Sequence, residues 1–169
     1  MGSLDIREAD HADLPAITEA LRQEAYFADR LARQAEGHGR LLVAWQDGRV
    51  VGNVYLWLAP AEEARLRELL PRVPLLTHLE VVPERRDQGI GTRLVRAAED
   101  RLRALGHRRV ALGVNLGNDR AHHLYRRLGY AEWAHGELAT TETVYHPDGK
   151  RESRPEICRI LVKSLGPAG

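Results

Sequence analysis

The sequence of 169 residues contains a single cysteine, Cys158, and no long apolar run. One cysteine excludes an intrachain disulfide and fits a reducing compartment, so we expect a cytoplasmic protein. A membrane-spanning helix needs about 18 or more consecutive apolar residues, and the chain has no such stretch. The amino terminus also lacks the apolar core of a signal peptide. We therefore expect no membrane partner, and the length predicts one domain over residues 1–169.

Lysine is almost absent, because only Lys150 and Lys163 accompany the arginines among the 25 basic residues. A phosphate-binding loop that ends in Gly-Lys-Ser/Thr is therefore excluded. The bias towards arginine indicates a GC-rich genome and hence a bacterial source. The basic residues are dispersed without interleaved aromatic residues, so we expect no nucleic-acid partner.

The most informative segment consists of a short apolar run, a basic turn with glycines, and an amphipathic pattern. Leu79–Val82 predicts a strand that Pro83 ends, because proline has no amide to continue a ladder. From Ile90 the apolar residues recur at helical spacing, and Gly106 stands where a left-handed helix stop is expected. The segment thus predicts a strand, a turn and a helix in succession.

The turn between that strand and helix carries Arg85, Arg86, Gly89 and Gly91. Glycine lets the backbone approach a ligand closely, and the first amides of a helix are unpaired donors at the positive end of its dipole. This arrangement favours a phosphate or pyrophosphate. The dinucleotide fingerprint is excluded, since it needs three glycines and an acidic residue about 20 positions further on.

A second motif occupies residues 115–130, which read Asn-Leu-Gly-Asn-Asp-Arg-Ala-His-His-Leu-Tyr-Arg-Arg-Leu-Gly-Tyr. Either Asn118 or Asp119 can cap a helix, and Gly129 is placed to end it. One face of this helix carries apolar residues at i, i+3, i+4 and i+7, namely Ala121, Leu124, Tyr125 and Leu128.

The two motifs together resemble the signatures of the GNAT superfamily of N-acetyltransferases, Arg-x-x-Gly-x-Gly and Asn-x-x-Ala-x-x-Leu-Tyr-x-x-Leu-Gly-Tyr. The resemblance implies a mixed α/β domain of the α+β type. Its central sheet would be mostly antiparallel, with a splayed parallel strand pair, and would be flanked by helices. It also implies acetyl-CoA as co-substrate. The cofactor-binding positions that it implies are Leu79, Val81, Arg86, Asp87, Gln88, Gly89, Ile90, Gly91, Thr92, Asn118 and Tyr125.

In the resembling fold the parallel strands separate after a bulge, here expected near Val81, and pantetheine bonds the strand backbone at positions equivalent to Leu79 and Val81. Direct transfer to an amine needs a base for the ammonium and an acid for the departing thiolate. The resemblance implies that Tyr125 is the acid. The base stays open between Glu80, His78 and a water chain, because strict alternation places His78 and Glu80 on the face opposite Val81 unless the bulge shifts the register. We name Tyr125 and Glu80 as the catalytic candidates.

Other residues are candidates for weaker roles. The acceptor pocket is expected to draw on Glu24, Tyr26, Phe27, Tyr55 and Trp57. The adjacent His122 and His123 cannot share one helix face, so we expect no metal site.

Periodicity and turn signals give an expected order of elements. Strands are expected at Leu4–Arg7, Arg40–Trp45, Val50–Leu58, Leu75–Val82, Val110–Val114, Tyr130–Leu138 and Ile157–Leu165. Helices are expected at Asp13–Glu24, Tyr26–Ala35 and Ala61–Leu70, and in the two motifs. His146–Gly149 is expected to be the turn before the last strand.

Charge differs between the two halves. Residues 1–75 carry 12 acidic and 9 basic side chains, a net charge of −3, and residues 76–169 carry 12 and 16, a net charge of +4. This bias suits an anionic cofactor and a cationic amine. We therefore expect an N-acetyltransferase that moves an acetyl group directly from acetyl-CoA to an amine of a small molecule or peptide. The alternative is a non-catalytic acyl-CoA-binding sensor, and a homodimer is left open.

Overall fold

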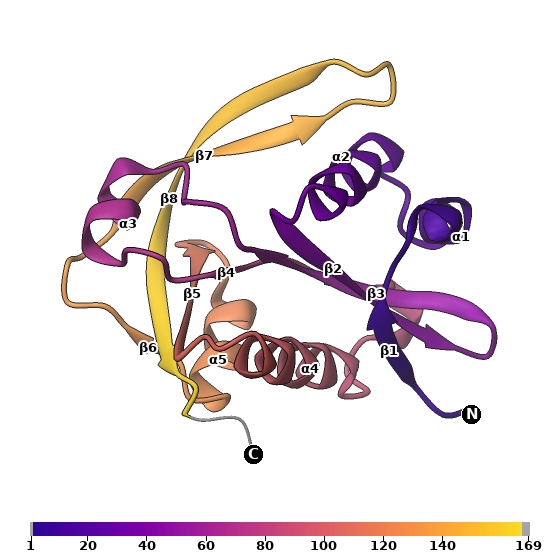
Figure 1. The fold of residues 1–169 in the computed structure, drawn as a ribbon, viewed down its shortest axis with the longest axis horizontal. Helices are drawn as coiled ribbons and strands as arrows, with labels where there is room; N and C mark the ends of the chain where they lie inside the picture. Colours follow the sequence, from indigo (N-terminus) through magenta and orange to yellow (C-terminus); the bar gives the residue numbers. More distant parts are fainter. Residues whose placement is uncertain (1, 167–169) are drawn as a thin grey trace.

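The computed structural model describes residues 2–166, which form a sheet with helices on both sides (Figure 1). The elements are β1 (Asp5–Glu8), η1 (His11–Asp13), α1 (Leu14–Leu21), α2 (Glu24–Ala35), β2 (Gly39–Gln46), β3 (Arg49–Trp57), α3 (Ala64–Leu69), β4 (Leu75–Val81), η2 (Pro83–Arg85), α4 (Ile90–Ala104), β5 (Arg109–Asn115), α5 (Asp119–Arg127), β6 (Ala131–Glu132), β7 (Leu138–Tyr145) and β8 (Arg151–Ser164). The strand order is β1-β2-β3-β4-β5-β8-β6, and β7 pairs with β8. The predicted fold class, mixed α/β with helices flanking a mostly antiparallel sheet, is confirmed.

The core lies where β2, β3 and β4 meet helices on each side of the sheet. Strands β2 and β3 are buried along nearly their whole length, which explains their continuous apolar runs. Helix α4 turns a stripe of apolar residues to this core at helical spacing. The stripe consists of Ile90, Leu94, Val95, Ala98 and Leu102. Helix α4 starts at the expected residue, and Gly106 has a φ of 92°, as its role in ending the helix predicts.

A buried ion pair fixes one wall of the functional site. Glu99 of α4 has no exposed surface and accepts hydrogen bonds from Lys163 Nζ at 2.9 Å and from the Tyr130 hydroxyl at 2.8 Å. The ring of Tyr130 packs edge-on against Tyr125, with 5.5 Å between their centroids. Because buried charges are stable only when paired, this network holds Tyr130, and through it Tyr125, in place.

Strands β4 and β5 are the parallel pair, and they separate almost at once. The register contains a single pair of partners, Leu75 with Ala111, whereas β5 pairs with β8 over its whole length. The register of β4 against β3 shifts between Asn53 and Tyr55, and His78 has a φ of 56°. The bulge therefore lies at His78, and the position expected for it near Val81 is wrong. Its cause is the left-handed backbone of His78, which side-chain alternation does not reveal.

The hairpin of β7 and β8 differs most from the expectation. A strand over Tyr130–Leu138 is wrong, because only β6 and the first residue of β7 fall in that range. The last strand starts at Arg151, six residues before the predicted Ile157, and the turn lies at the expected place. Half of the residues of β7 are exposed and only Leu138 is buried, so the strand lacks the alternation of a half-buried strand and is held by its pairing with β8.

The junction of α1 and α2 also differs. Helix α1 ends at Leu21 and α2 begins at Glu24, so the predicted boundaries at Glu24 and Tyr26 are both wrong. The two residues between the helices, Arg22 and Gln23, have φ values of 61° and 55°. Arginine and glutamine favour helices, and so nothing in their side chains signals this left-handed turn.

Candidate functional site

A cavity of about 710 Å³ lies between α2, the carboxyl end of β5 and the β7–β8 hairpin. His78, Leu79, Asn118 and Tyr125, all singled out from the sequence, line it. Of the expected acceptor-pocket residues, Tyr26 and Trp57 also line it, whereas Phe27, Tyr55 and Glu24 are not among its lining residues. We refer to this space as the central cavity.

A second hollow of about 690 Å³ lies beside it, between the turn after β4 and helix α5. We call it the loop hollow. It is lined by most of the positions that the resemblance implied for the cofactor, namely Leu79, Val81, Arg86, Asp87, Gly89, Ile90, Gly91, Thr92 and Asn118. Gln88 is not among its lining residues, and Tyr125 belongs to the central cavity. Leu79, Asn118 and Ala121 line both spaces, which therefore adjoin.

The start of α4 opens onto the loop hollow. Its first backbone hydrogen bond runs from the Arg93 amide to the Gly89 carbonyl, at 3.1 Å. The amides of Ile90, Gly91 and Thr92 therefore have no partner within the helix. Gly89 has a φ of 82°, and a Cβ placed on Gly91 would come no closer than 3.9 Å to its nearest neighbours, Leu79 and Val81. Gly91 thus places no side chain beside three amides that lack a partner within the helix, as an anion site requires.

Arginines surround the loop hollow. Arg86 Nε donates to the Val81 carbonyl at 3.2 Å, and Arg85, which also lines the hollow, donates from Nη1 to Gln46 Oε1 at 2.6 Å. On the opposite side Arg120, which forms an ion pair with Asp87, and Arg127 come from α5. Sequence reasoning missed these two residues. The signal was their spacing of seven, which places both on one face of the second-motif helix.

The Tyr125 side chain is only 7% exposed, and its hydroxyl makes no hydrogen bond to any described residue. Burial raises the pKa of this phenol above its ordinary value, so it is neutral near pH 7. Asn118 caps α5 by accepting from the Ala121 amide at 3.1 Å, and so the choice between Asn118 and Asp119 is settled.

Gln23 connects the two candidate bases. His78 Nε2 lies 3.0 Å from Gln23 Oε1, and Gln23 Nε2 donates to Glu80 Oε1 at 3.1 Å. Burial raises the pKa of the Glu80 carboxyl, and the hydrogen bond from Gln23 and the charge of Arg86 offset only part of that rise. Burial, together with the charge of Arg30, lowers the pKa of His78 to about 4. Glu80 is therefore the better proton acceptor of the two, although Glu80 itself lines the loop hollow and not the central cavity.

Several residues at and near the candidate bases have strained, left-handed backbone conformations. Gln23 and His78, which touch each other, are both non-glycine residues with positive φ, and Asp87 in the loop has a φ of 62°. Such backbone conformations persist where the surrounding structure enforces them, and they cluster at functional sites. Sequence reasoning missed Gln23, because its contacts depend on the left-handed junction of the two helices.

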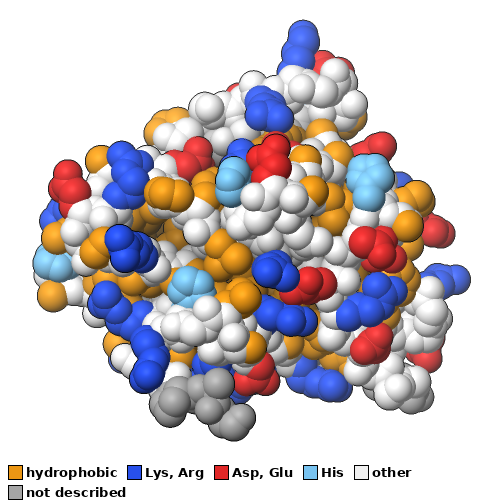
Figure 2. All heavy atoms as spheres, viewed as in Figure 1, with side chains coloured by type: hydrophobic (Ala, Val, Ile, Leu, Met, Phe, Trp, Pro, Cys, Tyr) orange, Lys and Arg blue, Asp and Glu red, His pale blue; other side chains and the backbone are white. Residues whose placement is uncertain are grey.

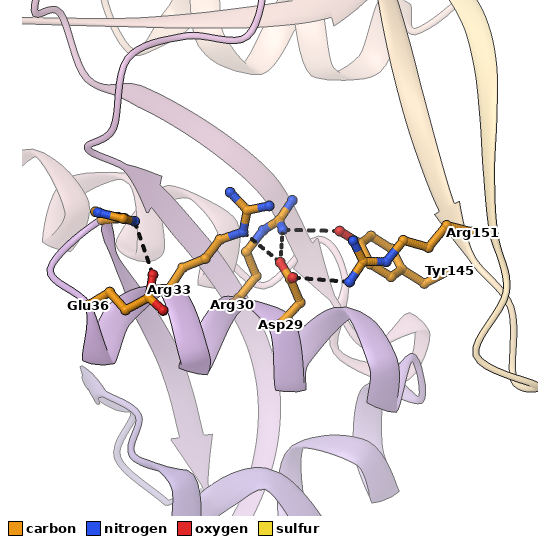
Figure 3. Close-up of polar contacts among 7 residues, drawn as sticks. Asp29, Arg30, Arg33, Glu36, Tyr145 and Arg151 are labelled. Atoms are coloured by element: carbon orange, nitrogen blue, oxygen red, sulfur yellow. Dashed lines mark hydrogen bonds and ion pairs between the residues drawn. The ribbon is translucent and has the colours of Figure 1, made fainter.

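A polar network joins α2 to the β7–β8 hairpin (Figure 3), and two of its members, Arg30 and Tyr145, line the central cavity. Asp29 accepts from Arg30 Nη1 at 2.6 Å and from Arg33 Nε at 2.7 Å, and it pairs with Arg151 of β8 at 3.4 Å. Arg30 also donates to the Tyr145 hydroxyl at 3.3 Å. The hairpin is thus fastened to α2 at its far end.

Charged side chains of both signs are interspersed over the face seen in Figure 2. Within residues 2–166, no group of three or more His, Cys, Asp or Glu side chains is placed to hold a metal ion. Over the same range, no helix has the length and apolar character needed to cross a membrane.

A comparison with family models identifies the chain. The model described as the Acetyltransferase (GNAT) family matches residues 4–130, which contain the strand-to-helix turn and the second motif. The chain belongs to this family. A relative from Bacillus subtilis (strain 168), described as the uncharacterized N-acetyltransferase YhfO, is 28% identical over 140 residues, which are 76% of this chain and 91% of that protein.

Solved structures of GNAT proteins share the fold. A phosphinothricin acetyltransferase from Sinorhizobium meliloti, crystallised with acetyl-CoA, has a TM-score of 0.70 and 23% identity and covers 96% of this chain and 89% of its own. The ribosomal-protein-S18-alanine N-acetyltransferase of Escherichia coli has a TM-score of 0.68 and 20% identity, covering 99% and 97%. At this level of identity the likeness shows the fold alone.

Proposed function

We propose that this GNAT protein is an N-acetyltransferase that moves an acetyl group directly from acetyl-CoA to the amine of a small molecule or peptide. The observation that carries the proposal is the junction of the two spaces. The loop hollow leads past Leu79 and Asn118 into the central cavity, where Tyr125 lies. A ligand with an anionic end and a reactive thioester end fits this arrangement.

The residues of the loop hollow fit a pyrophosphate. The amides of residues 90–92, which have no partner within the helix, supply hydrogen-bond donors, and the side chains of Arg86, Arg120 and Arg127 supply further donors and positive charge. The edge of β4 beyond Leu75 has no partner in β5, which leaves backbone groups of Leu79 free to bind an extended arm. The Val81 carbonyl already accepts from Arg86, and an arm that used it would displace that contact.

Bound acetyl-CoA would supply the activated acetyl group. Glu80 would take a proton from the acceptor ammonium, directly or through water. Its raised pKa lies nearer the pKa of the ammonium than that of an ordinary carboxylate does, which makes it the stronger base. Tyr125 would donate a proton to the departing thiolate from its hydroxyl. Cys158 also lines the central cavity, but burial raises the pKa of its thiol to about 11, which favours direct transfer over an acyl-cysteine.

Two measurements on the purified protein test this proposal. Titration calorimetry with acetyl-CoA should show binding at one site, and free thiol should be released from acetyl-CoA only when an acceptor amine is present. Binding without thiol release over a broad panel of amines would instead support an acyl-CoA sensor. No binding at all would remove the assignment of the loop hollow.

A further inference from the structure

Carboxylates dominate the charged residues of the central cavity. Glu62 and Glu63 come from the segment before α3, and Glu142 and Glu156 come from the β7–β8 hairpin. Of the described residues that line this cavity, Arg30 is the only arginine or lysine. Acidic groups therefore face the cavity from two separate elements.

The one positive charge in the wall is already compensated. Arg30 Nη1 forms an ion pair with Asp29 at 2.6 Å. Burial raises the pKa of the Asp29 carboxyl, but the hydrogen bonds and charges of Arg33 and Arg30 lower it by more, so Asp29 stays ionised. The guanidinium lies 4.5 Å from the ring centroid of Tyr26 and 5.5 Å from that of Trp57. Arg30 thus has an anionic partner, whereas no Lys or Arg side chain among the described residues forms an ion pair with the carboxylates of the cavity.

The contacts of individual carboxylates agree with this. Glu156 accepts from Asn115 Nδ2 at 3.1 Å and from the Thr140 hydroxyl, both of which are neutral groups. Glu142 lies opposite Arg154 in the hairpin, but the guanidinium of Arg154 pairs with Glu152 at 2.9 Å. No ion pair involves Glu62, Glu63, Glu142 or Glu156 among the described side chains.

Three buried polar atoms in the same wall lack a hydrogen-bond partner among the described residues: the Tyr26 hydroxyl, His78 Nδ1 and Arg30 Nε. Tyr26 is 5% exposed and its hydroxyl has no hydrogen-bond partner among the described residues. His78 Nδ1 likewise has none. Since Gln23 donates to Glu80, its Oε1 faces His78 and accepts the proton on Nε2, and His78 Nδ1 is left with a lone pair. Buried polar groups are nearly always satisfied, so the Tyr26 hydroxyl and His78 Nδ1, which can both accept, fit a ligand that brings N–H donors, whereas Arg30 Nε needs an acceptor.

The size and enclosure of the cavity favour a small ligand. Its volume of about 710 Å³ lies in the range typical of small-molecule sites. Tyr145 and Arg151 fasten the hairpin to α2, so two of its walls are joined to each other (Figure 3).

We propose that the acceptor is a small amine that carries at least one further cationic group. The reacting amine would lie near His78 and Tyr125, and the second cation would lie among Glu62, Glu63, Glu142 and Glu156. The inference rests on the proposed function, because it names the substrate class of the same site. It excludes acceptors whose second group is a carboxylate, since these would face the acidic wall.

The test compares three amines of equal chain length: 1,4-diaminobutane, 1-aminobutane and 4-aminobutanoate. With saturating acetyl-CoA, thiol release should give a kcat/KM about tenfold or more higher for the diamine than for the monoamine, and lowest for the amino acid. The preference should shrink as salt is added, because screening weakens exposed charge pairs. Equal or better turnover of the monoamine or the amino acid would overturn the inference while leaving the acetyltransferase intact.

Variants of the acidic residues test which of them produce the preference for the diamine. Glu142→Gln and Glu62→Gln should each lower the ratio of diamine to monoamine kcat/KM about two- to fivefold, and the double variant should lower it further. Glu68→Gln is the matched control, because Glu68 is an exposed residue of α3 outside the cavity lining. An unchanged ratio in the double variant would refute the assignment. If the protein binds acetyl-CoA but none of the three amines causes thiol release, that result would instead count against the proposed function.

Discussion

The side-chain amide of Gln23 lies 3.1 Å from the carboxylate of Glu80, although the two residues are 57 positions apart in the sequence. The contact comes from the left-handed junction of α1 and α2, which turns Gln23 towards β4. A hydrogen bond to a carboxylate favours its charged form. Gln23 therefore limits how far burial raises the pKa of Glu80.

Replacing Gln23 by asparagine tests this relationship. Asparagine tolerates the left-handed backbone, but its shorter side chain should not reach Glu80. The pKa of Glu80 should then rise, and the acidic limb of the profile of kcat/KM against pH should move to higher pH, because the base must be deprotonated. Glu24→Gln, at the next and exposed position, should leave that limb in place. A profile that does not move in Gln23→Asn would mean that Glu80 is not the titrating base.

His78 predicts a pH dependence of stability. Its pKa is lowered to about 4 in the folded protein and stays near 6.5 in the unfolded chain. Between these values the unfolded state binds more protons, so stability falls as the pH drops from 6.5 towards 4 and this loss levels off below about 4. Between pH 7 and pH 5 the loss should be about 2 kcal/mol. Urea unfolding at the two pH values measures it.

The variant His78→Asn should remove that part of the pH dependence, since asparagine keeps the left-handed backbone without titrating. His123→Gln, which replaces an exposed histidine of α5, is the matched control and should keep it. Equal slopes in all three proteins would show that His78 does not titrate differently on folding.

Gly91 predicts a separation of ligand binding from stability. A Cβ at this position meets only ordinary contacts with Leu79 and Val81, so Gly91→Ala should fold and should gain up to about 1 kcal/mol of helix stability. Gly91→Glu places bulk and negative charge at the helix start. Its affinity for acetyl-CoA should fall about 100-fold in calorimetry, because like charges a few ångströms apart repel by several kcal/mol. Tight binding by the glutamate variant would mean that no anion lies there.

The sequence predicted the parts of this site whose signals are local. The boundaries of α4 follow from its apolar spacing and its glycines, and residue type narrowed the cap of α5 to Asn118 or Asp119, of which the structure selects Asn118. The positions that were missed depend on distant contacts. Nothing local marks Gln23 as left-handed, and β7 has exposed residues on both faces, so its pattern gives no strand signal. Arg120 reaches the loop only because α5 packs beside it.

The last prediction concerns the acid. Tyr125→Phe keeps the ring and its packing against Tyr130 but removes the hydroxyl, which bonds no described residue. Stability should therefore change by less than the roughly 1 kcal/mol of a lost hydrogen bond, and the melting temperature and acetyl-CoA affinity should be nearly normal. Loss of a general acid costs about 10²–10⁴ in kcat, and because a thiolate leaves readily, the effect should lie near the lower bound. Tyr130→Phe is the matched control, since it removes the hydroxyl that donates to buried Glu99 and should lower stability more than kcat. Wild-type turnover by Tyr125→Phe on a verified acceptor would leave Tyr125 with a packing role only.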